Sequence, residues 1–223
     1  MNNGLQELKL LRFFSMSSFL EGFLLQASLI LALGAQNLFV LESGLRRQKH
    51  ALAATVCTIC DFALIFVGVL GAASVFVRYP LLKISFGGAG VAFLFYYGIL
   101  KLKDFRSPSL AIGPNQPGPD RARSVFAAAM AFSLLNPHVY LDTVILIGGY
   151  AAKFPAWQER LVFGTGAGVF STLWFYGLAF AASSLSALLR KPKRMRFVSL
   201  ASGLILIGLA LKLGHDVWGW ISL

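Results

Sequence analysis

The feature that most constrains this fold is a series of six apolar stretches, each long enough to cross a membrane. A helix needs roughly 20 consecutive apolar residues to cross the hydrocarbon core of a bilayer. Stretches of that kind occupy residues 18–42, 51–74, 81–101, 124–150, 157–189 and 197–213. We expect the fifth to span only residues 160–183, because the whole stretch is too long. The sequence therefore predicts an all-α integral membrane protein with six transmembrane helices.

Composition agrees with this prediction. Hydrophobic residues make up 57% of the chain and charged residues only 13%, with a mean hydropathy of +0.71. A soluble domain is normally about a quarter charged, so these residues cannot cover a water-facing surface. The net charge of +11 would point to nucleic acid in a soluble protein. In a membrane protein, positively charged cytoplasmic loops account for it, and no nucleic-acid partner is expected.

The distribution of basic residues predicts the orientation. The first, third and fifth loops hold 13 of the 20 Lys and Arg residues, and the opposite side holds 7. Because cytoplasmic loops carry the excess of positive charge, both termini are predicted to lie outside and these three loops in the cytoplasm. The three basic groups are Arg46, Arg47 and Lys49; Lys101, Lys103, Arg106, Arg121 and Arg123; and Arg190, Lys191, Lys193, Arg194 and Arg196.

The chain divides into two similar halves. Residues 102–123 are rich in Pro and Gly, which predicts a cytoplasmic loop between a first three-helix repeat at 18–101 and a second at 124–215. Residues 1–17 form an N-terminal extension, interpreted as an interfacial helix, and Met16 is a second candidate translation start. Three helices per half is an odd number, so the second half must enter the membrane from the opposite side. Two inverted three-helix repeats are the architecture of many secondary transporters.

Each half has a polar interruption in its first span. Gly34 begins one interruption, followed by Gln36 and Asn37, and Asn136 with Pro137 forms the other. Proline removes a backbone hydrogen bond, and backbone groups freed inside a membrane need a polar partner. The side-chain amides suit the carboxylate and amine of an amino acid. The alternative is a packing kink that binds no ligand.

Two carboxylates are predicted to lie deep in the membrane. Asp61 is about ten residues into its span, hence ~15 Å deep, and Asp142 is deep in the fourth span. A buried carboxylate costs several kcal/mol unless it is paired, protonated or exposed to a cavity, so such residues mark functional sites by default. The alternative is a hydrogen bond to a neighbouring helix with no further role. His138 is also deep, where it would relay protons or only donate a hydrogen bond.

The remaining motifs favour helix packing over chemistry. Cys57 and Cys60 share one helical face, but no second pair completes a metal site. We find no nucleophile elbow, phosphate loop or His-Glu-x-x-His motif, so no enzymatic activity, catalytic residue, cofactor or bound metal is expected. Small residues that allow helices to approach closely are Gly68, Gly71, Gly164, Gly166 and Gly168.

Three motifs resemble the lysine/arginine exporter (LysE-type) family of bacterial inner-membrane transporters. They are Gly34-Ala35-Gln36-Asn37, the run Asp61-x-x-Leu64-Ile65-x-x-Gly68-x-x-Gly71, and Asn136-Pro137-His138-Val139-Tyr140-Leu141-Asp142-Thr143. In order and spacing they extend the resemblance over residues 17–215. Branches that export neutral amino acids usually have Pro-Gly-Pro where this chain has Gly-Ala-Gln, which favours the basic-amino-acid branch.

The resemblance implies a multi-pass inner-membrane carrier that exports L-lysine or L-arginine, driven by the proton motive force. Its partners would be the basic amino acid, membrane lipid and, as one option, further copies of the chain. Asp61, Asp142 and His138 are then the candidates for proton coupling, and Gly34 and Pro137 are the helix breaks. The implied substrate-binding residues are Gln36, Asn37, Asp61, Asn136, Tyr140, Asp142 and Thr143.

Two other functions remain open from the sequence. A divalent-metal exporter of the same superfamily would use Asp61, Cys57, Cys60 and His138. A membrane thiol oxidoreductase would use the two cysteines, although such carriers place their reactive cysteines on different helices. Sequence also cannot separate a substrate-binding aspartate from a proton-carrying one.

Overall fold

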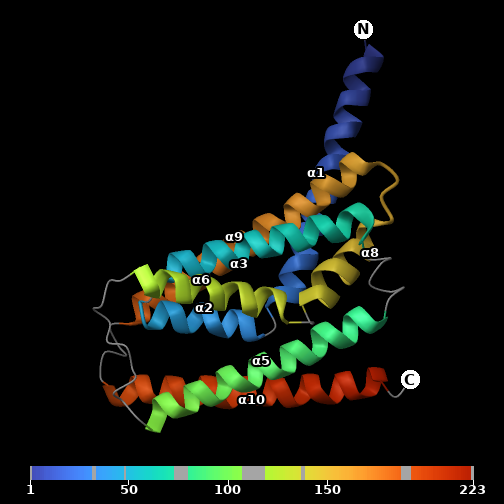
Figure 1. The fold of residues 1–223 in the computed structure, drawn as a ribbon. Coiled ribbons are helices and arrows are strands. Elements are labelled where there is room, and N and C mark those ends of the chain that lie inside the picture. Colours follow the sequence, from blue (N-terminus) through green and yellow to red (C-terminus); the bar gives the residue numbers. More distant parts are fainter. Residues whose placement is uncertain are drawn as a thin grey trace. The chain divides into compact units, whose positions relative to one another are not determined.

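The computed structural model describes residues 2–31, 34–47, 49–72, 80–106, 119–136, 139–186 and 192–221, and within these ranges every regular element is a helix (Figure 1). The all-α fold class is therefore confirmed for this part of the chain. The elements are α1 (Asn2–Ile30), α2 (Ala35–Leu45), α3 (His50–Val67), the π-helical turn η1 (Gly68–Ala72), α5 (Pro80–Arg106), α6 (Pro119–Leu134), the π-helical segment η3 (Tyr140–Ile147), α8 (Gly148–Ala151), α9 (Trp157–Leu185) and α10 (Pro192–Ile221).

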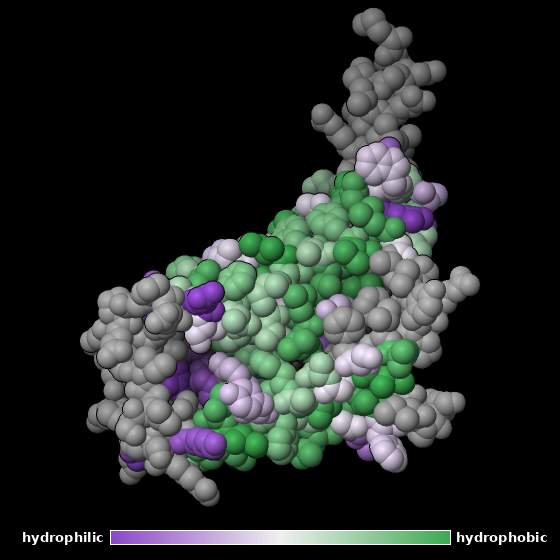
Figure 2. Space-filling model, in the orientation of Figure 1, coloured by the Kyte–Doolittle hydropathy of each residue, from purple (hydrophilic) through white to green (hydrophobic). Residues whose placement is uncertain are grey.

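Several of these helices are long and apolar enough to cross a membrane. Among the described residues, His50–Gly71, Trp157–Leu185 and Arg196–Gly219 qualify singly, and Met16–Ile30 with Ala35–Leu45 qualifies as an interrupted pair. Ala122–Leu134 and Tyr140–Ala151 are shorter apolar helices. Large apolar side chains are exposed along these helices, and the described residues on the face shown in Figure 2 are mainly apolar. This surface fits lipid, while the arrangement of six spans as two inverted repeats stays a prediction.

The helix boundaries follow from local sequence. Proline is the first residue of α5, α6 and α10, where its fixed φ suits a helix start and its missing N–H has no intrahelical partner anyway. Helix α5 continues to Arg106 and α6 begins at Pro119, so helices occupy both ends of the loop predicted at 102–123. The predicted N-terminal extension is continuous with the first span in α1, and α9 is one uninterrupted helix from Trp157 to Leu185.

Both predicted interruptions coincide with helix ends. Helix α1 ends at Ile30 and α2 begins at Ala35, with Gly34 in an extended conformation before it (φ −97°, ψ 172°). Helix α6 ends at Leu134, and η3 begins at Tyr140. Pro137 and His138 lie outside the described residues.

The chain forms two compact units, each assembled from distant segments. Unit 1 comprises Met1–Ala32, Thr58–Arg78 and His138–Trp174. Unit 2 comprises Leu33–Cys57, Tyr79–Pro137 and Phe175–Leu223. Helices α3 and α9 contribute residues to both units, and each interrupted span gives one helix to each unit. The residues of one unit are thus adjacent in space but not in sequence.

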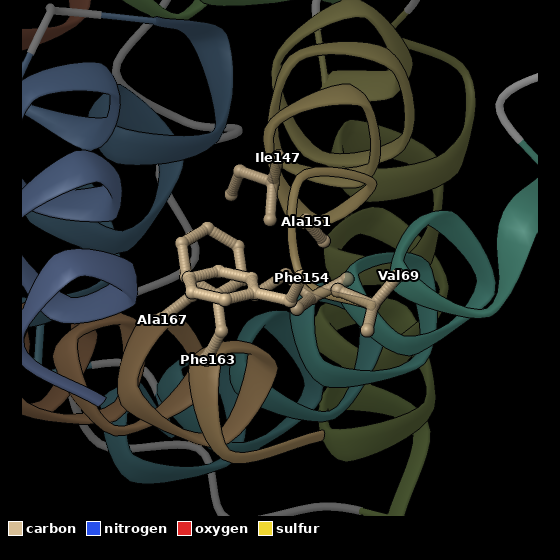
Figure 3. Close-up of a cluster of buried hydrophobic side chains, with 7 residues drawn as sticks. Val69, Ile147, Ala151, Phe154, Phe163 and Ala167 are labelled. Atoms are coloured by element: carbon tan, nitrogen blue, oxygen red, sulfur yellow. The ribbon is translucent and has the colours of Figure 1, made fainter. Parts of the chain in front are cut away.

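Unit 1 has a core built by α3, η1, η3, α8 and α9. Its members are buried apolar side chains, drawn in Figure 3: Ile65, Val69, Ile147, Ala151, Phe154, Phe163 and Ala167. Leu25 and Leu29 of α1 pack against this cluster. The left-handed conformation of Gly71 (φ 108°) interrupts the helical geometry of η1 just past this core. No described atom lies within 4 Å of a Cβ added there, so close packing at Gly71 stays a prediction, and its left-handed conformation accounts for the glycine by itself.

Two of the other predicted small residues, Gly166 and Gly68, lie against the backbone of a neighbouring segment. A Cβ on Gly166 would lie 2.0 Å from the carbonyl oxygen of Phe19, and one on Gly22 would lie 1.9 Å from that of Phe163. Helices α1 and α9 therefore cross at a reciprocal pair of glycines. Within the same unit, Gly68 abuts the backbone of Val144, which joins η1 to η3. Small residues at such contacts let backbones approach closely where no hydrophobic effect drives association.

Unit 2 contains a second reciprocal glycine contact. Helices α5 and α10 lie side by side and run in opposite directions (Figure 1). A Cβ on Gly98 would lie 3.2 Å from the carbonyl oxygen of Gly203, and one on Gly203 would lie 3.1 Å from that of Gly98. Helix α5 also packs on α6, where Phe93 contacts the buried ring of Phe132 edge to face at 4.8 Å.

The α1–α9 crossing gives the first prediction. Gly22→Ala and Gly166→Ala each place a methyl group against a backbone oxygen, so the two helices must separate. We expect each variant to lose about 1–3 kcal/mol of stability, measured as a lower midpoint of thermal unfolding of the purified protein in detergent.

The matched control is Gly149→Ala, because a Cβ on that glycine of α8 would meet nothing within 4 Å. Its unfolding midpoint should stay the same or rise slightly, since alanine favours a helix more than glycine does. Equal loss of stability in all three variants would contradict the proposed backbone contact.

Candidate functional site

Unit 1 contains a buried, hydrogen-bonded group of three polar side chains from three helices. Asp61 of α3 is only 2% exposed. Its Oδ2 accepts a hydrogen bond from the hydroxyl of Ser171 on α9 at 2.9 Å. Gln26 of α1 donates from Nε2 to the same hydroxyl oxygen at 2.7 Å and lies 3.5 Å from Oδ2 of Asp61. The described contacts therefore place two neutral donors around one carboxylate oxygen.

This arrangement agrees with the sequence prediction for Asp61 and adds two residues to it. A carboxylate away from water needs compensation, and hydrogen bonds to its charged form supply part of that compensation. A full charge in the ligand would supply more. The group can therefore hold Asp61 in a fixed position while its charge is balanced by a proton or by a cationic ligand.

The other predicted site residues of unit 1 lie on η3. Tyr140 and Thr143 are buried and Asp142 is partly buried. The hydroxyl of Thr143 donates to the carbonyl oxygen of Val139 at 2.5 Å, one turn earlier, so this side chain satisfies a backbone group at the start of the segment. π-Helical turns in membrane helices often occur at functional sites, and this one carries the conspicuous polar residues of the fourth span.

In unit 2 the two interrupted spans meet directly. Gln36, in the first turn of α2, donates from Nε2 to the hydroxyl of Ser133 near the end of α6 at 3.0 Å. One turn further along α2, Phe39 stacks on Phe132 at 4.9 Å between ring centroids. Asn37 and Asn136 are also buried, and each is close in sequence to a residue that makes one of these contacts. The predicted amides thus lie at the facing ends of two half-helices within one unit.

The start of α2 also carries a partial positive charge. The first backbone N–H groups of a helix have no intrahelical acceptor, and aligned peptide dipoles make that end positive. Gly34 provides no side-chain cap to cover them. This end would attract the carboxylate of an amino acid, as half-helix ends do in secondary transporters.

A buried ion cluster that the sequence did not predict also lies in unit 2. Glu42 of α2 accepts from Nε of Arg46 and from Nζ of Lys101 on α5, both at 2.7 Å, and its side chain is 5% exposed. Arg46 also donates to the hydroxyl of Ser199 on α10. Lys101 lies 5.2 Å from the ring centroid of Tyr97. The cluster ties α2, α5 and α10 together.

A more exposed ion pair joins two segments of unit 1. Lys153, between α8 and α9, contacts Glu21 of α1, and Tyr150 donates to the same carboxylate at 3.0 Å. The hydrogen bond with Glu21 raises the pKa of Lys153 from its ordinary value. At 33% and 45% exposure, the side chains of this pair are far more hydrated than the cluster around Glu42.

The residues proposed for metal or thiol chemistry show no assembled centre in the described part of the chain. No group of three His, Cys, Asp or Glu side chains able to hold a metal lies within the described ranges. His138, which the metal hypothesis also used, falls outside them. Cys57 and Cys60 are buried and are not joined in a disulfide bond. No described feature favours either alternative function.

Comparison with known proteins covers most of the chain. Residues 27–217 match the family model described as "LysE type translocator". A protein of Aeromonas salmonicida named "Putative amino-acid transporter YggA" is 41% identical over 87% of this chain and 94% of its own length. "Arginine exporter protein ArgO" of Salmonella enteritidis is 34% identical over 90% of this chain and 94% of its own length. The protein of the same name from Pectobacterium carotovorum is 35% identical over 90% of this chain and 98% of its own length. No solved structure matches the chain.

The Glu42 cluster gives a prediction about stability. Glu42→Gln leaves Lys101 and Arg46 without their carboxylate in a buried place, and breaking a buried pair in this way costs about 3–5 kcal/mol. The matched control is Glu21→Gln, since exposed ion pairs contribute about 0–1 kcal/mol. The midpoint of thermal unfolding should therefore fall much further for Glu42→Gln than for Glu21→Gln. Equal shifts would show that the cluster around Glu42 is as hydrated as the exposed pair.

Proposed function

The chain belongs to the LysE type translocator family, and from this premise we propose that it exports arginine, and lysine as a second basic amino acid, out of the cytoplasm. The observation that carries the proposal is the burial of Asp61 at 2% exposure within a fixed hydrogen-bonded group. A cationic side chain needs such an anion inside a membrane protein. The names of the arginine exporters in the comparison support the same substrate class.

The same carboxylate supports coupling to a proton gradient. An ionised Asp61 attracts either a proton or a cationic side chain, and binding of one removes the charge that attracts the other. A carrier that presents this group to one side of the membrane and then the other would exchange protons for basic amino acids. The proton motive force would then drive export, with no nucleotide required. Asp142 and His138 remain the other candidates for the proton.

The polar ends of the interrupted helices support a role for the substrate's common part. The positive end of α2 favours the α-carboxylate, and the amides of Gln36, Asn37 and Asn136 offer donors and acceptors for the α-amine and α-carboxylate. Tyr140 and Thr143 complete the proposed set. We propose substrate-binding roles for these residues and for Asp61 and Asp142, each within its own unit.

The content of the two units supports the inverted repeat. In such a repeat the first span corresponds to the fourth, the second to the fifth and the third to the sixth. Unit 1 contains the first part of the first and fifth spans and the last part of the second and fourth. The parts that correspond to these in the other repeat are the first part of the fourth and second spans and the last part of the fifth and first spans. All of these parts belong to unit 2. Unit 2 adds the third and sixth spans, which pack together as α5 and α10.

Transport by reconstituted protein tests the proposed function. Proteoliposomes loaded with labelled arginine or lysine should release the label when a proton gradient is imposed. Asp61→Asn keeps the size and hydrogen-bonding shape of the side chain but removes the charge, so export should fall at least tenfold, on the order of the loss of one charged hydrogen bond. Release of neither amino acid by the native chain would refute basic-amino-acid export.

The control for this variant is Glu159→Gln, which neutralises a carboxylate in the first turn of α9 away from the group around Asp61. It should export at the native rate. Both variants should be recovered from the membrane in native amounts, so that a loss of export reflects the site. Native export by Asp61→Asn would eliminate both proposed roles of Asp61.

Labelling of single cysteines tests the orientation. In a Cys57→Ser, Cys60→Ser background, Lys49→Cys lies in the first basic loop and Gln158→Cys at the start of α9, and both positions are exposed. The positive-inside rule predicts that a membrane-impermeant maleimide labels position 158 but not position 49 in intact cells. The reverse pattern would invert the proposed topology.

A further inference from the structure

Gln26 has a buried polar atom that no described residue satisfies. The side chain is 2% exposed, and its Oε1 is buried without a hydrogen-bond partner in the part of the chain that the structure describes. A buried acceptor left without a donor costs about 1–3 kcal/mol. The amide nitrogen of the same side chain is fully engaged toward Ser171 and Asp61. One half of this amide is therefore held in place while the other half lacks a donor.

The direction of the amide is determined by its neighbours. If nitrogen and oxygen were exchanged, the carbonyl oxygen would lie 3.5 Å from the carboxylate oxygen of Asp61, and two acceptors would face each other. The hydroxyl of Ser171 donates its hydrogen to Asp61, so it can only accept from Gln26. The nitrogen must therefore point to Ser171, and Oε1 must point away from it.

The missing partner of Oε1 is an N–H or O–H donor next to a carboxylate. Oε1 and Nε2 share one amide carbon, so the unsatisfied oxygen is only one amide group away from the anionic site of Asp61. A guanidinium group fits this pair of acceptors well, because it is planar, permanently charged and carries five N–H donors on different edges. An ammonium group is a compact point charge, and it concentrates its donors on a single atom.

We propose that Gln26 is a specificity-determining residue that accepts an N–H from the substrate's guanidinium group through Oε1, while Asp61 balances the charge. The proposal rests on the export function proposed above and specifies its preferred substrate class as guanidinium amino acids. Ser171 is a positioning residue, because it touches Asp61 and Gln26 and orients both. A site that has a buried hydrogen-bonding group discriminates against ligands that leave that group unpaired.

The test compares arginine with lysine in the same variant. Gln26→Met keeps the length of the side chain and removes both polar atoms. We expect kcat/KM for arginine export in proteoliposomes to fall about tenfold more than kcat/KM for lysine, so that the preference for arginine is lost. Equal losses for both amino acids, or no loss, would overturn the proposal, because a purely structural role or a bound water at Oε1 predicts no change in preference.

Two controls separate this result from a general defect. Ser28→Ala changes an exposed hydroxyl two residues along α1 that donates only to the carbonyl oxygen of Leu25, and it should leave both export rates unchanged. Ser171→Ala removes the positioning hydroxyl but leaves Oε1, so it should slow both amino acids and reduce the preference less than Gln26→Met does. If Ser171→Ala abolished the preference while Gln26→Met kept it, the assignment of the acceptor to Gln26 would be wrong.

Binding to the purified protein distinguishes failure of this inference from failure of the proposed function. Arginine and agmatine both carry a guanidinium group, so both should raise the thermal unfolding midpoint of the native chain and should do so much less for Gln26→Met. A native chain that exports neither amino acid but shows this difference would refute the export function and leave the guanidinium site supported. Equal stabilisation of the native chain and of Gln26→Met would refute the guanidinium site.

If Gln26→Met is not recovered in folded form, Gln26→Glu provides the same test. Glutamate keeps an acceptor at the position of Oε1 but places a second oxygen 3.5 Å from Oδ2 of Asp61, so export of both amino acids should fall while the preference for arginine over lysine is retained. Loss of that preference in a folded Gln26→Glu variant would count against the proposal.

Discussion

Backbone hydrogen bonding inside lipid is the constraint on which the rest of this structure depends. No water is present in the hydrocarbon core, so every peptide group must find its partner within the protein. Continuous helices such as α9 and α10 meet that demand by themselves. The breaks after Ile30 and after Leu134 do not, and these are the places where amide and hydroxyl side chains gather. The interrupted helices therefore determine where polar chemistry can exist in an otherwise apolar molecule.

Close helix contact follows from the same surroundings. Lipid is as apolar as the side chains, so burying leucine between helices gives little advantage, and backbone proximity must hold the helices together. The reciprocal glycines at the α1–α9 crossing and at the α5–α10 contact meet that need in both units. The α1–α9 crossing also matters for the candidate site, because Gln26 and Ser171 lie one turn or more beyond it on the same two helices.

The buried carboxylates Glu42 and Asp61 have different described hydrogen-bond partners. Glu42 is buried but has two cations beside it, so it serves to hold α2, α5 and α10. The described hydrogen bonds to Asp61 come from neutral donors, and in the proposed function a proton or a cationic ligand balances its charge. The described partners of the two carboxylates therefore differ, and we propose transport for Asp61 and a stabilising role for Glu42.

Sequence by itself determined the helical class, the membrane setting, the family and the identity of Asp61 as a buried carboxylate, because span length, charge distribution and local motifs are properties of neighbouring residues. It also predicted where the first and fourth spans break, since glycine and proline act locally. Only the tertiary structure brought Ser171 to Asp61 across 110 positions and Lys101 to Glu42 across 59. Gln26 carried no local signal, since a glutamine within an apolar helix becomes significant only when the neighbouring helices show which of its atoms lacks a partner. Contacts between distant helices depend on packing, and packing is decided by three-dimensional fit that no local pattern encodes.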